Sequence, residues 1–166
     1  IGVVLLDLHI FSGSILEYIR LGNPASSRAD AIRAADAVQA TPFIERLPEG
    51  FDTHLNERGQ NLSQGERQLL AFARVLVADP EILVLDEATA SIDTQTEAIV
   101  QSALETLMQG RTAIIIAHRL QTIRSADRIV VLKHGEIREV GRHEELMAAK
   151  GIYYTLSQLQ FQEVIQ

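Results

Sequence analysis

Apolar residues in the first part of the chain change their spacing from that of a strand to that of a helix. Residues 1–6 are almost entirely apolar and rich in β-branched side chains, which predicts a buried strand. From residue 14 to residue 47 the apolar positions recur at three and four residues, which predicts two helices separated by the Asn-Pro breaker at 23–24. Residues 48–60 show little periodicity, so we expect a loop there.

The second half of the chain alternates between amphipathic and purely apolar runs. Ser63 with Glu66 predicts a capping box at the start of a helix over residues 63–78, and Asp79-Pro80 ends that helix. The next expected elements are a strand at 82–85, a helix at 94–108, a strand at 112–117, a short segment at 120–124 and a strand at 129–132. This alternation predicts parallel β-α-β units and therefore an α/β fold.

The C-terminal part of the chain predicts a hairpin followed by two helices. His134-Gly135 lies between two apolar runs, as is typical of a hairpin turn. Residues 142–150 and 153–162 have the spacing of closing helices. We find no internal repeat and no low-complexity segment.

Length and composition limit the class of protein. The chain has 166 residues, of which 46% are hydrophobic and 22% charged, which suits about one folded domain and excludes a disordered tail. A net charge of −7 argues against non-specific nucleic-acid binding. The absence of cysteine excludes disulfides, thiolate metal sites and cysteine nucleophiles. No apolar run reaches the ~18 residues that a membrane span requires. The first residue is Ile rather than Met and lies in an apolar run, so we expect a fragment that begins inside a strand.

The sequence LSQGE, at residues 62–66, places a glycine at the predicted start of a long helix. The unpaired N–H groups and the positive dipole end of such a helix favour an anion, and Gly65 would let a phosphate approach closely. The same residues also fit a structural interpretation, in which Ser63 only caps the helix and Gly65 only forms a turn. On this motif alone, both interpretations stay open.

Carboxylates and a histidine follow two of the predicted strands. Asp86 and Glu87 come at the end of one strand, where parallel sheets gather their ligands. One carboxylate can hold Mg²⁺, and the next can orient or deprotonate a water molecule. His118 ends the neighbouring strand, within reach of a terminal phosphate. Asp93 is a candidate cap for the following helix. Each position also fits an ordinary cap, core or surface residue when it is taken alone.

The runs LSQGERQ, ILVLDEATASID and IIIAHRL, in this order and spacing, resemble the nucleotide-binding domain of ATP-binding cassette (ABC) transporters. The resemblance covers nearly the whole chain. It implies that Asp86 ends the Walker B strand and holds Mg²⁺, that Glu87 is the general base, and that His118 is the switch histidine at the γ-phosphate. It also implies a D-loop that ends at Asp93. The implied nucleotide-binding residues are Leu62, Ser63, Gln64, Gly65, Glu66 and Asp93.

Flanking residues resemble the exporter branch of this family, notably DLHIFSGSI near the start and ERGQNLSQGE around the signature motif. The resemblance implies that the segment from Glu57 to Gln60 faces the coupling helices of a transmembrane domain. It also implies that two nucleotide-binding domains pair head to tail, so that Ser63 and Gly65 act on the nucleotide of the partner.

The implied fold is α/β, with a partial parallel sheet core like that of P-loop NTPases and an inserted α-helical subdomain. Within a single domain spanning 1–166, we place the helical subdomain at 14–78 and the core, with its C-terminal helices, at 1–13 and 79–166. The implied function is ATP hydrolysis that drives export, with ATP and Mg²⁺ as cofactors. The implied location is the cytoplasmic face of a membrane, as part of a transporter, with no nucleic-acid partner.

Two features depart from the family pattern. No segment has the GxxxxGK and Ser or Thr of a P-loop, and the nearest, around Gly110, has Arg111 in place of the lysine. Leu6 stands where exporters have a glutamine that contacts Mg²⁺ and the attacking water, and leucine has no polar side-chain atom. We therefore expect the isolated chain to hydrolyse ATP at no measurable rate.

Two alternative functions are open at this point. A DNA-repair or chromosome-type ABC ATPase shares the motifs, but the short stretch between Leu6 and Leu62 has no sustained heptads for coiled-coil arms. A non-hydrolysing regulatory half of an asymmetric ABC pair is favoured by Leu6 and disfavoured by Glu87.

Overall fold

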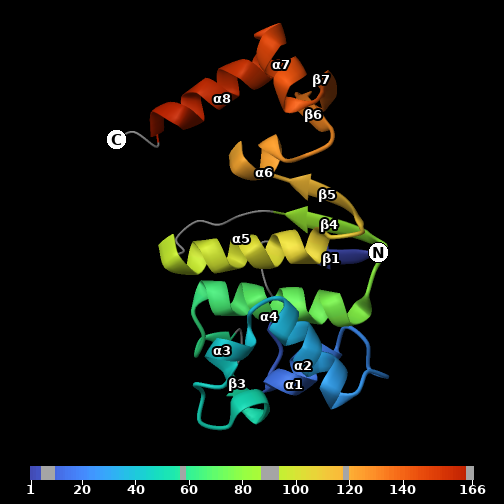
Figure 1. Cartoon of the computed structure of the whole chain (residues 1–166), viewed down its shortest axis with the longest axis vertical. Coiled ribbons are helices and arrows are strands. Elements are labelled where there is room, and N and C mark those ends of the chain that lie inside the picture. Colours follow the sequence, from blue (N-terminus) through green and yellow to red (C-terminus); the bar gives the residue numbers. More distant parts are fainter. Residues whose placement is uncertain (5–9, 57–58, 87–93, 118–119, 164–166) are drawn as a thin grey trace. The chain divides into compact units, whose positions relative to one another are not determined.

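The structure is a computed structural model that describes residues 1–4, 10–56, 59–86, 94–117 and 120–163. The chain divides into two compact units, Ile1–Ile116 and Ala117–Gln166. The first unit contains β1 (Gly2–Val4), β2 (Gly13–Ser14), α1 (Ile15–Arg20), α2 (Arg28–Ala37), α3 (Thr41–Ile44), the 3₁₀ helix η1 (Gly50–Asp52), β3 (His54–Leu55), α4 (Gln64–Ala78), β4 (Ile82–Asp86), α5 (Thr94–Met108) and β5 (Thr112–Ile116). The second contains α6 (Leu120–Arg124), β6 (Ile129–Lys133), β7 (Glu136–Gly141), α7 (His143–Ala149) and α8 (Ile152–Glu163) (Figure 1). The subdomain boundaries at 14–78 stay a prediction.

A parallel sheet of three strands, in the order β1-β4-β5, is the frame of the first unit. The register places Val3, Val84 and Ile114 in one row across the three strands. The pairing of β4 with β5 confirms the parallel β-α-β unit that the sequence predicts. Leu83 and Leu85 point to the other face of β4, where they are almost completely buried in the main hydrophobic core.

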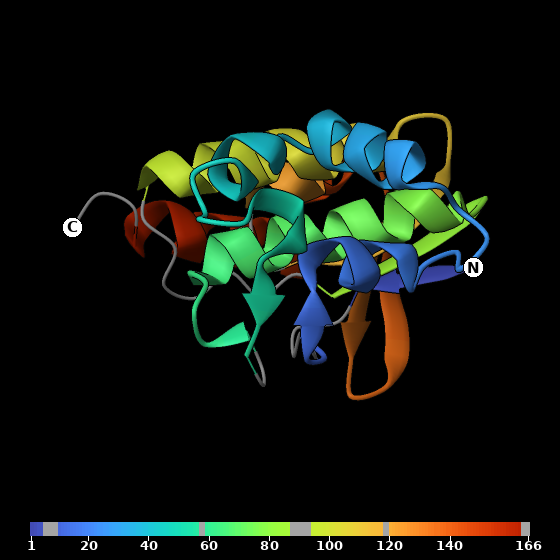
Figure 2. The ribbon, with the colours of Figure 1, turned by 90° about the horizontal axis from the view of Figure 1, so that it is seen from below.

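Helix α4 is the central helix of the first unit. It packs against β1 and α5, and also against α1 and α2 (Figures 1 and 2). Residues 69–73 are all buried, which requires that several sides of the helix be covered. The capping box between Ser63 and Glu66 confirms the predicted helix start, and Asp79 ends the helix in a left-handed conformation.

Local hydrogen bonds explain where the first two helices begin. Ser14 with Glu17 and Ser27 with Asp30 form capping boxes at α1 and α2, in the region where the sequence predicts helices. The Arg28 guanidinium then donates two hydrogen bonds of 2.8 Å to Asp52 and so joins α2 to η1. These hydrogen bonds hold the pKa of Asp52 below its ordinary value.

The predicted loop at 48–60 contains two short elements that its sequence pattern does not predict. Residues Gly50–Asp52 form η1, and His54–Leu55 form β3. β3 pairs antiparallel with β2, which places Ser14 opposite His54 and Gly13 opposite Leu55. Two paired residues are too few to produce a period-two pattern, and their partner lies far back along the chain.

The second unit contains an antiparallel hairpin. β6 pairs antiparallel with β7, whereas the expectation that residues 129–132 also extend the parallel arrangement stays a prediction. The turn between the two strands explains the antiparallel pairing: His134 and Gly135 both have positive φ, which returns the chain beside β6. The predicted hairpin turn is therefore confirmed, and α7 and α8 confirm the two closing helices.

The hairpin of the second unit packs one face on the helices that follow it. Ile129 and Val131 of β6 form a small core with Leu146 and Tyr153. Glu139 of β7 accepts hydrogen bonds from the backbone N–H groups of residues 152 and 153, at 2.6 and 3.0 Å. A carboxylate at the amino end of a helix accepts hydrogen bonds from backbone N–H groups that have no partner within the helix, and its negative charge interacts favourably with the helix dipole. Glu139 therefore holds the start of α8 against the hairpin.

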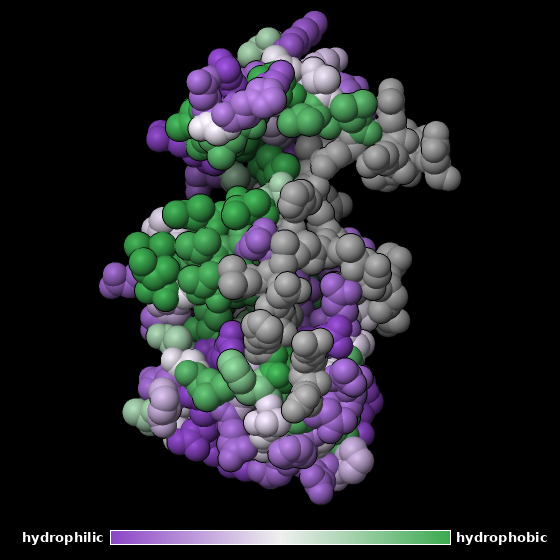
Figure 3. Space-filling model, turned by 180° about the vertical axis from the view of Figure 1, so that it is seen from behind, coloured by the Kyte–Doolittle hydropathy of each residue, from purple (hydrophilic) through white to green (hydrophobic). Residues whose placement is uncertain are grey.

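One face of the parallel sheet in the first unit is exposed. The side chains of Val3, Ile114 and Ile116 are 45%, 57% and 54% exposed. Figure 3 shows apolar side chains gathered in this part of the surface. Parallel sheets are generally covered on both faces, and β4 and β5 have the continuous apolar sequence of such strands. The expectation of buried strands is therefore met on one face only.

Candidate functional site

The carboxyl ends of β4 and β5 and the amino ends of α4 and α5 lie at one end of the first unit (Figure 1). Connectivity requires this arrangement, because α4 leads through Asp79-Pro80 to the start of β4, and α5 leads to the start of β5. Asp86 is the last residue of β4, half-buried, and lies opposite Ile116 of β5. One carboxylate and two helix starts thus lie at the end of the unit where parallel sheets gather their ligands.

The start of α4 is held by reciprocal hydrogen bonds within LSQGE. The Ser63 backbone N–H donates to the Glu66 carboxylate at 2.8 Å, and the Glu66 N–H donates to the Ser63 hydroxyl at 3.3 Å. Ser63 is exposed and Gln64 is half-buried, whereas Leu62 is only 5% exposed and belongs to the core. Leu62 therefore anchors this segment, while Ser63 and Gln64 remain accessible to a ligand.

Gly65 lies where α4 and α5 pack closely together. A Cβ atom added to Gly65 would lie 2.1 Å from the Thr96 Cγ2 atom and 3.7 Å from Val100 Cγ2. Glycine is thus required for helix packing at this position. This is a second structural reason for the residue, distinct from the predicted close approach of a phosphate.

Several predicted site residues lie outside the described residues. These are Glu87, Asp93, His118 and Leu6, together with the first two residues of the segment from Glu57 to Gln60. Among the residues that the structure does describe, no group of three or more acidic or histidine side chains could hold a metal ion. Asp86, the predicted Mg²⁺ ligand, lies within the described residues.

Arg111 has a structural environment that differs from that of a P-loop lysine. Its guanidinium donates to the backbone carbonyls of Pro80, Leu107 and Gln109, at 3.1, 2.9 and 3.3 Å, and to the Asp79 carboxylate at 2.7 Å. The side chain is only 14% exposed. Arg111 fastens the ends of α4 and α5 to the start of β4, which agrees with the sequence-based conclusion that it belongs to no P-loop.

Two residues near the site were not singled out from the sequence. Thr96 contacts the position of Gly65, and Arg67 donates hydrogen bonds to the carbonyls of Leu62 and Gly59, at 2.7 and 3.3 Å. The sequence feature that could have identified Arg67 is its positive charge near the start of a helix. The helix dipole disfavours a cation there, so an arginine at this position indicates that its guanidinium has hydrogen-bond acceptors nearby.

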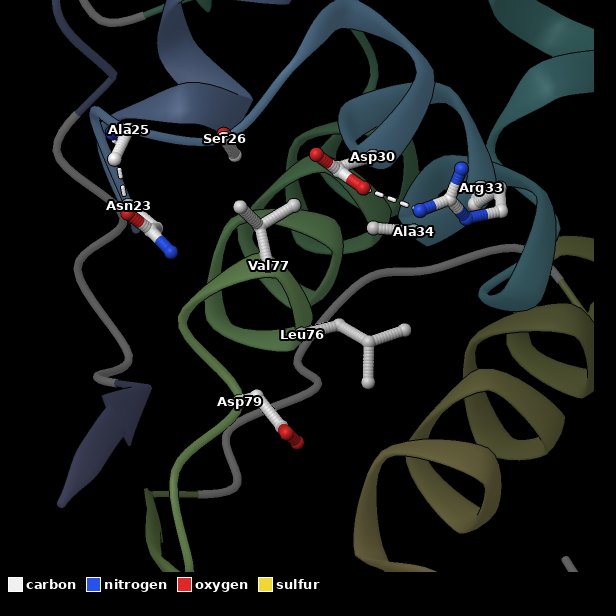
Figure 4. A pocket seen from close by; sticks show the side chains of 9 residues that line it. All are labelled: Asn23, Ala25, Ser26, Asp30, Arg33, Ala34, Leu76, Val77 and Asp79. Atoms are coloured by element: carbon white, nitrogen blue, oxygen red, sulfur yellow. Dashed lines mark hydrogen bonds and ion pairs between the residues drawn. The ribbon is translucent and has the colours of Figure 1, made fainter.

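A surface hollow lies between α2 and the carboxyl-terminal part of α4 (Figure 4). Its volume is about 560 Å³, and it contains none of the predicted site residues. An ion pair between Asp30 and Arg33 lies at its rim (Figure 4). The lining residues are Asn23, Ala25, Ser26, Asp30, Arg33, Ala34, Leu76, Val77 and Asp79.

Among the helices in the described part of the chain, none combines the length and the apolar character needed to span a bilayer.

Comparisons with known proteins agree on one family. Residues 1–90 match the family described as ABC transporter. The chain is 54% identical, over its whole length, to the ABC transporter ATP-binding protein YknV of Bacillus subtilis, and 52% identical over 98% of its length to an ATP-dependent lipid A-core flippase of Syntrophus aciditrophicus. It spans 28% and 27% of the lengths of these relatives.

A solved structure gives the same result. A bacterial Atm1-family ABC exporter with ATP bound superposes with a TM-score of 0.86 at 42% identity, over 96% of this chain and 28% of the exporter chain. The likeness covers both the parallel sheet and the helices, so the predicted α/β fold class is confirmed. Because the family match spans more than half of its residues, the chain belongs to the ABC transporter family, and its sequence is that of an ATP-binding domain.

Proposed function

We propose that the chain is the part of an ABC exporter ATP-binding domain that carries the Walker B carboxylates and the signature motif, and that it serves ATP hydrolysis coupled to export. The observation that carries this proposal is the position of Asp86 at the carboxyl end of β4, at the same end of the unit as the capped start of α4. Similarity to an ATP-dependent flippase and to an ATP-bound exporter supports it.

Asp86 fits a magnesium site because its carboxylate is a hard oxygen donor that is partly accessible at the strand end. When bound, Mg²⁺ with ATP supplies the phosphate to be cleaved and the charge that neutralises it. Glu87 would accept the proton of the attacking water as general base. His118 would contact the γ-phosphate, and Asp93 would lie in the D-loop beside the nucleotide.

The signature motif would act on the nucleotide of a second ATP-binding domain, paired head to tail with this one. Ser63 is exposed, and its hydroxyl accepts a 3.3 Å hydrogen bond from the Glu66 N–H, a contact that does not use the hydroxyl proton, which could therefore be donated to a phosphate. Gln64 is partly exposed on the same helix start. The close packing of Gly65 against α5 would hold the start of α4 at a fixed position along α5.

A transmembrane domain would dock on the helical part of the first unit, near the segment from Glu57 to Gln60. Phe11 is 59% exposed, and His54 and Gln60 are exposed as well. An exposed aromatic beside polar residues suits a protein interface. Such docking would place the chain at the cytoplasmic face of a membrane.

The test is a chimera in which this chain replaces the matching segment of the Bacillus subtilis protein YknV. Glu87→Gln in the chimera should lower ATP turnover by about 10²–10⁴-fold, while ATP binding is retained, because the amide keeps the shape but loses the basic oxygen. Glu81→Gln, an exposed glutamate just before β4, is the matched control and should leave turnover unchanged. Near-parental hydrolysis by the Glu87 variant would refute the assignment.

The same chimera discriminates the second candidate, the non-hydrolysing regulatory half that Leu6 favours. A chimera that binds ATP, hydrolyses none, and gains hydrolysis on Leu6→Gln would support a regulatory role. Hydrolysis by the parent chimera would reject it.

A further inference from the structure

Residues 59–62 form a tight turn directly before α4. Gly59 is buried, has a φ of +61°, and donates its N–H to the Asn56 carbonyl at 2.8 Å. The Leu62 N–H then donates to the Gly59 carbonyl at 3.0 Å. The turn is fixed to β3 by Asn61, whose side-chain amide donates to the His54 carbonyl at 3.3 Å.

Arg67 reaches back from the first turn of α4 to this preceding turn. One guanidinium nitrogen donates to the Leu62 carbonyl at 2.7 Å and to the Gly59 carbonyl at 3.3 Å. The aliphatic stem of Arg67 lies under Gly59: a Cβ added to Gly59 would be 3.2 Å from Arg67 Cδ and 2.7 Å from Ile10 Cδ1. The turn therefore has a hydrogen-bonded side and a packed side, and Arg67 supplies part of both.

The backbone of Arg67 also belongs to the start of α4. Its N–H donates to the Ser63 carbonyl at 3.1 Å, next to the Glu66 N–H that donates to the Ser63 hydroxyl. The same residue thus holds the helix start through its backbone and the turn through its side chain. A cation near the amino end of a helix opposes the helix dipole, and the hydrogen bonds to two carbonyls offset that cost.

We infer that Arg67 is a positioning residue that makes the 59–62 turn and the LSQGE helix start one rigid piece, so that displacement of the turn displaces the helix start. The inference deepens the proposed function and rests on it for its meaning. Gln60 lies in the segment proposed to face the transmembrane domain, and Ser63 lies in the segment proposed to contact the partner nucleotide. Arg67 would then carry the effect of docking at the first segment to the second.

The test is amide hydrogen exchange on the 166-residue chain, without nucleotide or membrane partner. Arg67→Met keeps a long apolar side chain and removes the donors. We expect the amides of Gly59, Leu62 and Glu66 to exchange about tenfold faster and by the same factor. Amides of α2 and of the last turns of α4 should be unchanged. Arg67→Lys, which restores a cation and donors, should recover part of the protection.

Acceleration confined to the turn or confined to the helix start would overturn the inference, because the two would then open separately. Uniform acceleration of all amides would also overturn it, since that is the result of a residue that only adds global stability. Unchanged exchange in Arg67→Met would have the same meaning. The outcome does not depend on ATP hydrolysis, so failure of the proposed function in the chimera and failure of this inference are distinguishable.

Discussion

At Gly65 the backbone of α4 lies so close to Thr96 that no side chain fits between them. Gly65→Ala would place a methyl group 2.1 Å from the present position of Thr96 Cγ2. We expect this variant to lower the free energy of unfolding by about 1–2 kcal/mol, because overpacking outweighs the helix propensity gained. Thr96→Ser removes the Cγ2 atom and keeps the hydroxyl, so Gly65→Ala should cost less in that background. Urea unfolding of the four chains of this double-mutant cycle measures the coupling.

Gly50→Ala is the control for the Thr96→Ser background. Gly50 has a φ of +52° and open space around its Cβ position, so alanine there meets backbone strain without a clash. Its cost should be the same in the parent chain and in the Thr96→Ser chain. Equal costs of Gly65→Ala in both backgrounds would show that the Thr96 methyl is not what requires glycine.

Structural roles that depend on residues nearby in the sequence could be predicted, whereas roles that depend on contacts with distant parts of the chain could not. Ser63 and Glu66 form the predicted capping box because both partners lie within one helical turn. The packing role of Gly65 depends on Thr96 of another helix, and that of Arg111 depends on the Pro80 carbonyl and the Asp79 carboxylate, which lie far back along the chain. The phosphate role predicted for Gly65 stays a prediction, as do the roles of Glu87 and His118.

At the scale of elements, the ends of α4 and α5 are joined to β4 by one side chain, that of Arg111. Arg111→Met keeps the stem and leaves the carbonyls of Pro80 and Leu107 without this donor. We expect the free energy of unfolding to fall by about 2–3 kcal/mol, since the lost donors serve partly buried acceptors and a carboxylate. Urea unfolding followed by circular dichroism measures the loss.

Arg33→Met is the matched control for Arg111. Arg33 also pairs with an aspartate, but its side chain is 71% exposed. Exposed ion pairs contribute little, so this change should cost less than about 0.5 kcal/mol. Equal losses from both variants would mean that the carbonyl contacts of Arg111 add nothing beyond its ion pair with Asp79.

The helices and the parallel strands could be predicted because each has a periodic pattern of its own. The short strand β3 could not, because its pairing with β2 is non-local and only two residues long. β6 has the same apolar character as β4 and β5, so its sequence predicts a strand but does not specify the direction of its partner. Its antiparallel pairing follows from the turn at His134, which the sequence did indicate.

At the scale of the whole molecule, family membership follows from the order of three motifs rather than from any one of them. Each motif alone fits a cap or a turn, and the structure supplies such structural reasons for Ser63, Gly65 and Glu66. A structural reason does not compete with a nucleotide-binding role, because a ligand site requires a fixed backbone. The match to an ATP-bound exporter over nearly the whole chain reflects this combination.

The exposed face of the parallel sheet leads to a prediction about association of the 166-residue chain. Ile114 and Ile116 are more than half exposed on β5, and Ile114 shares a row with the half-buried Val84 and the exposed Val3. An apolar surface of this kind promotes association. Ile114→Thr with Ile116→Thr keeps β-branched side chains and lowers the apolar area. We expect the double variant to stay monomeric at higher concentration in light-scattering measurements, with little change in the urea midpoint.

Leu83→Thr, on the buried face, is the control and should instead lower the urea midpoint strongly because it places a hydroxyl in the core. Association that is unchanged in the double variant would show that this face is not the surface through which the chain associates.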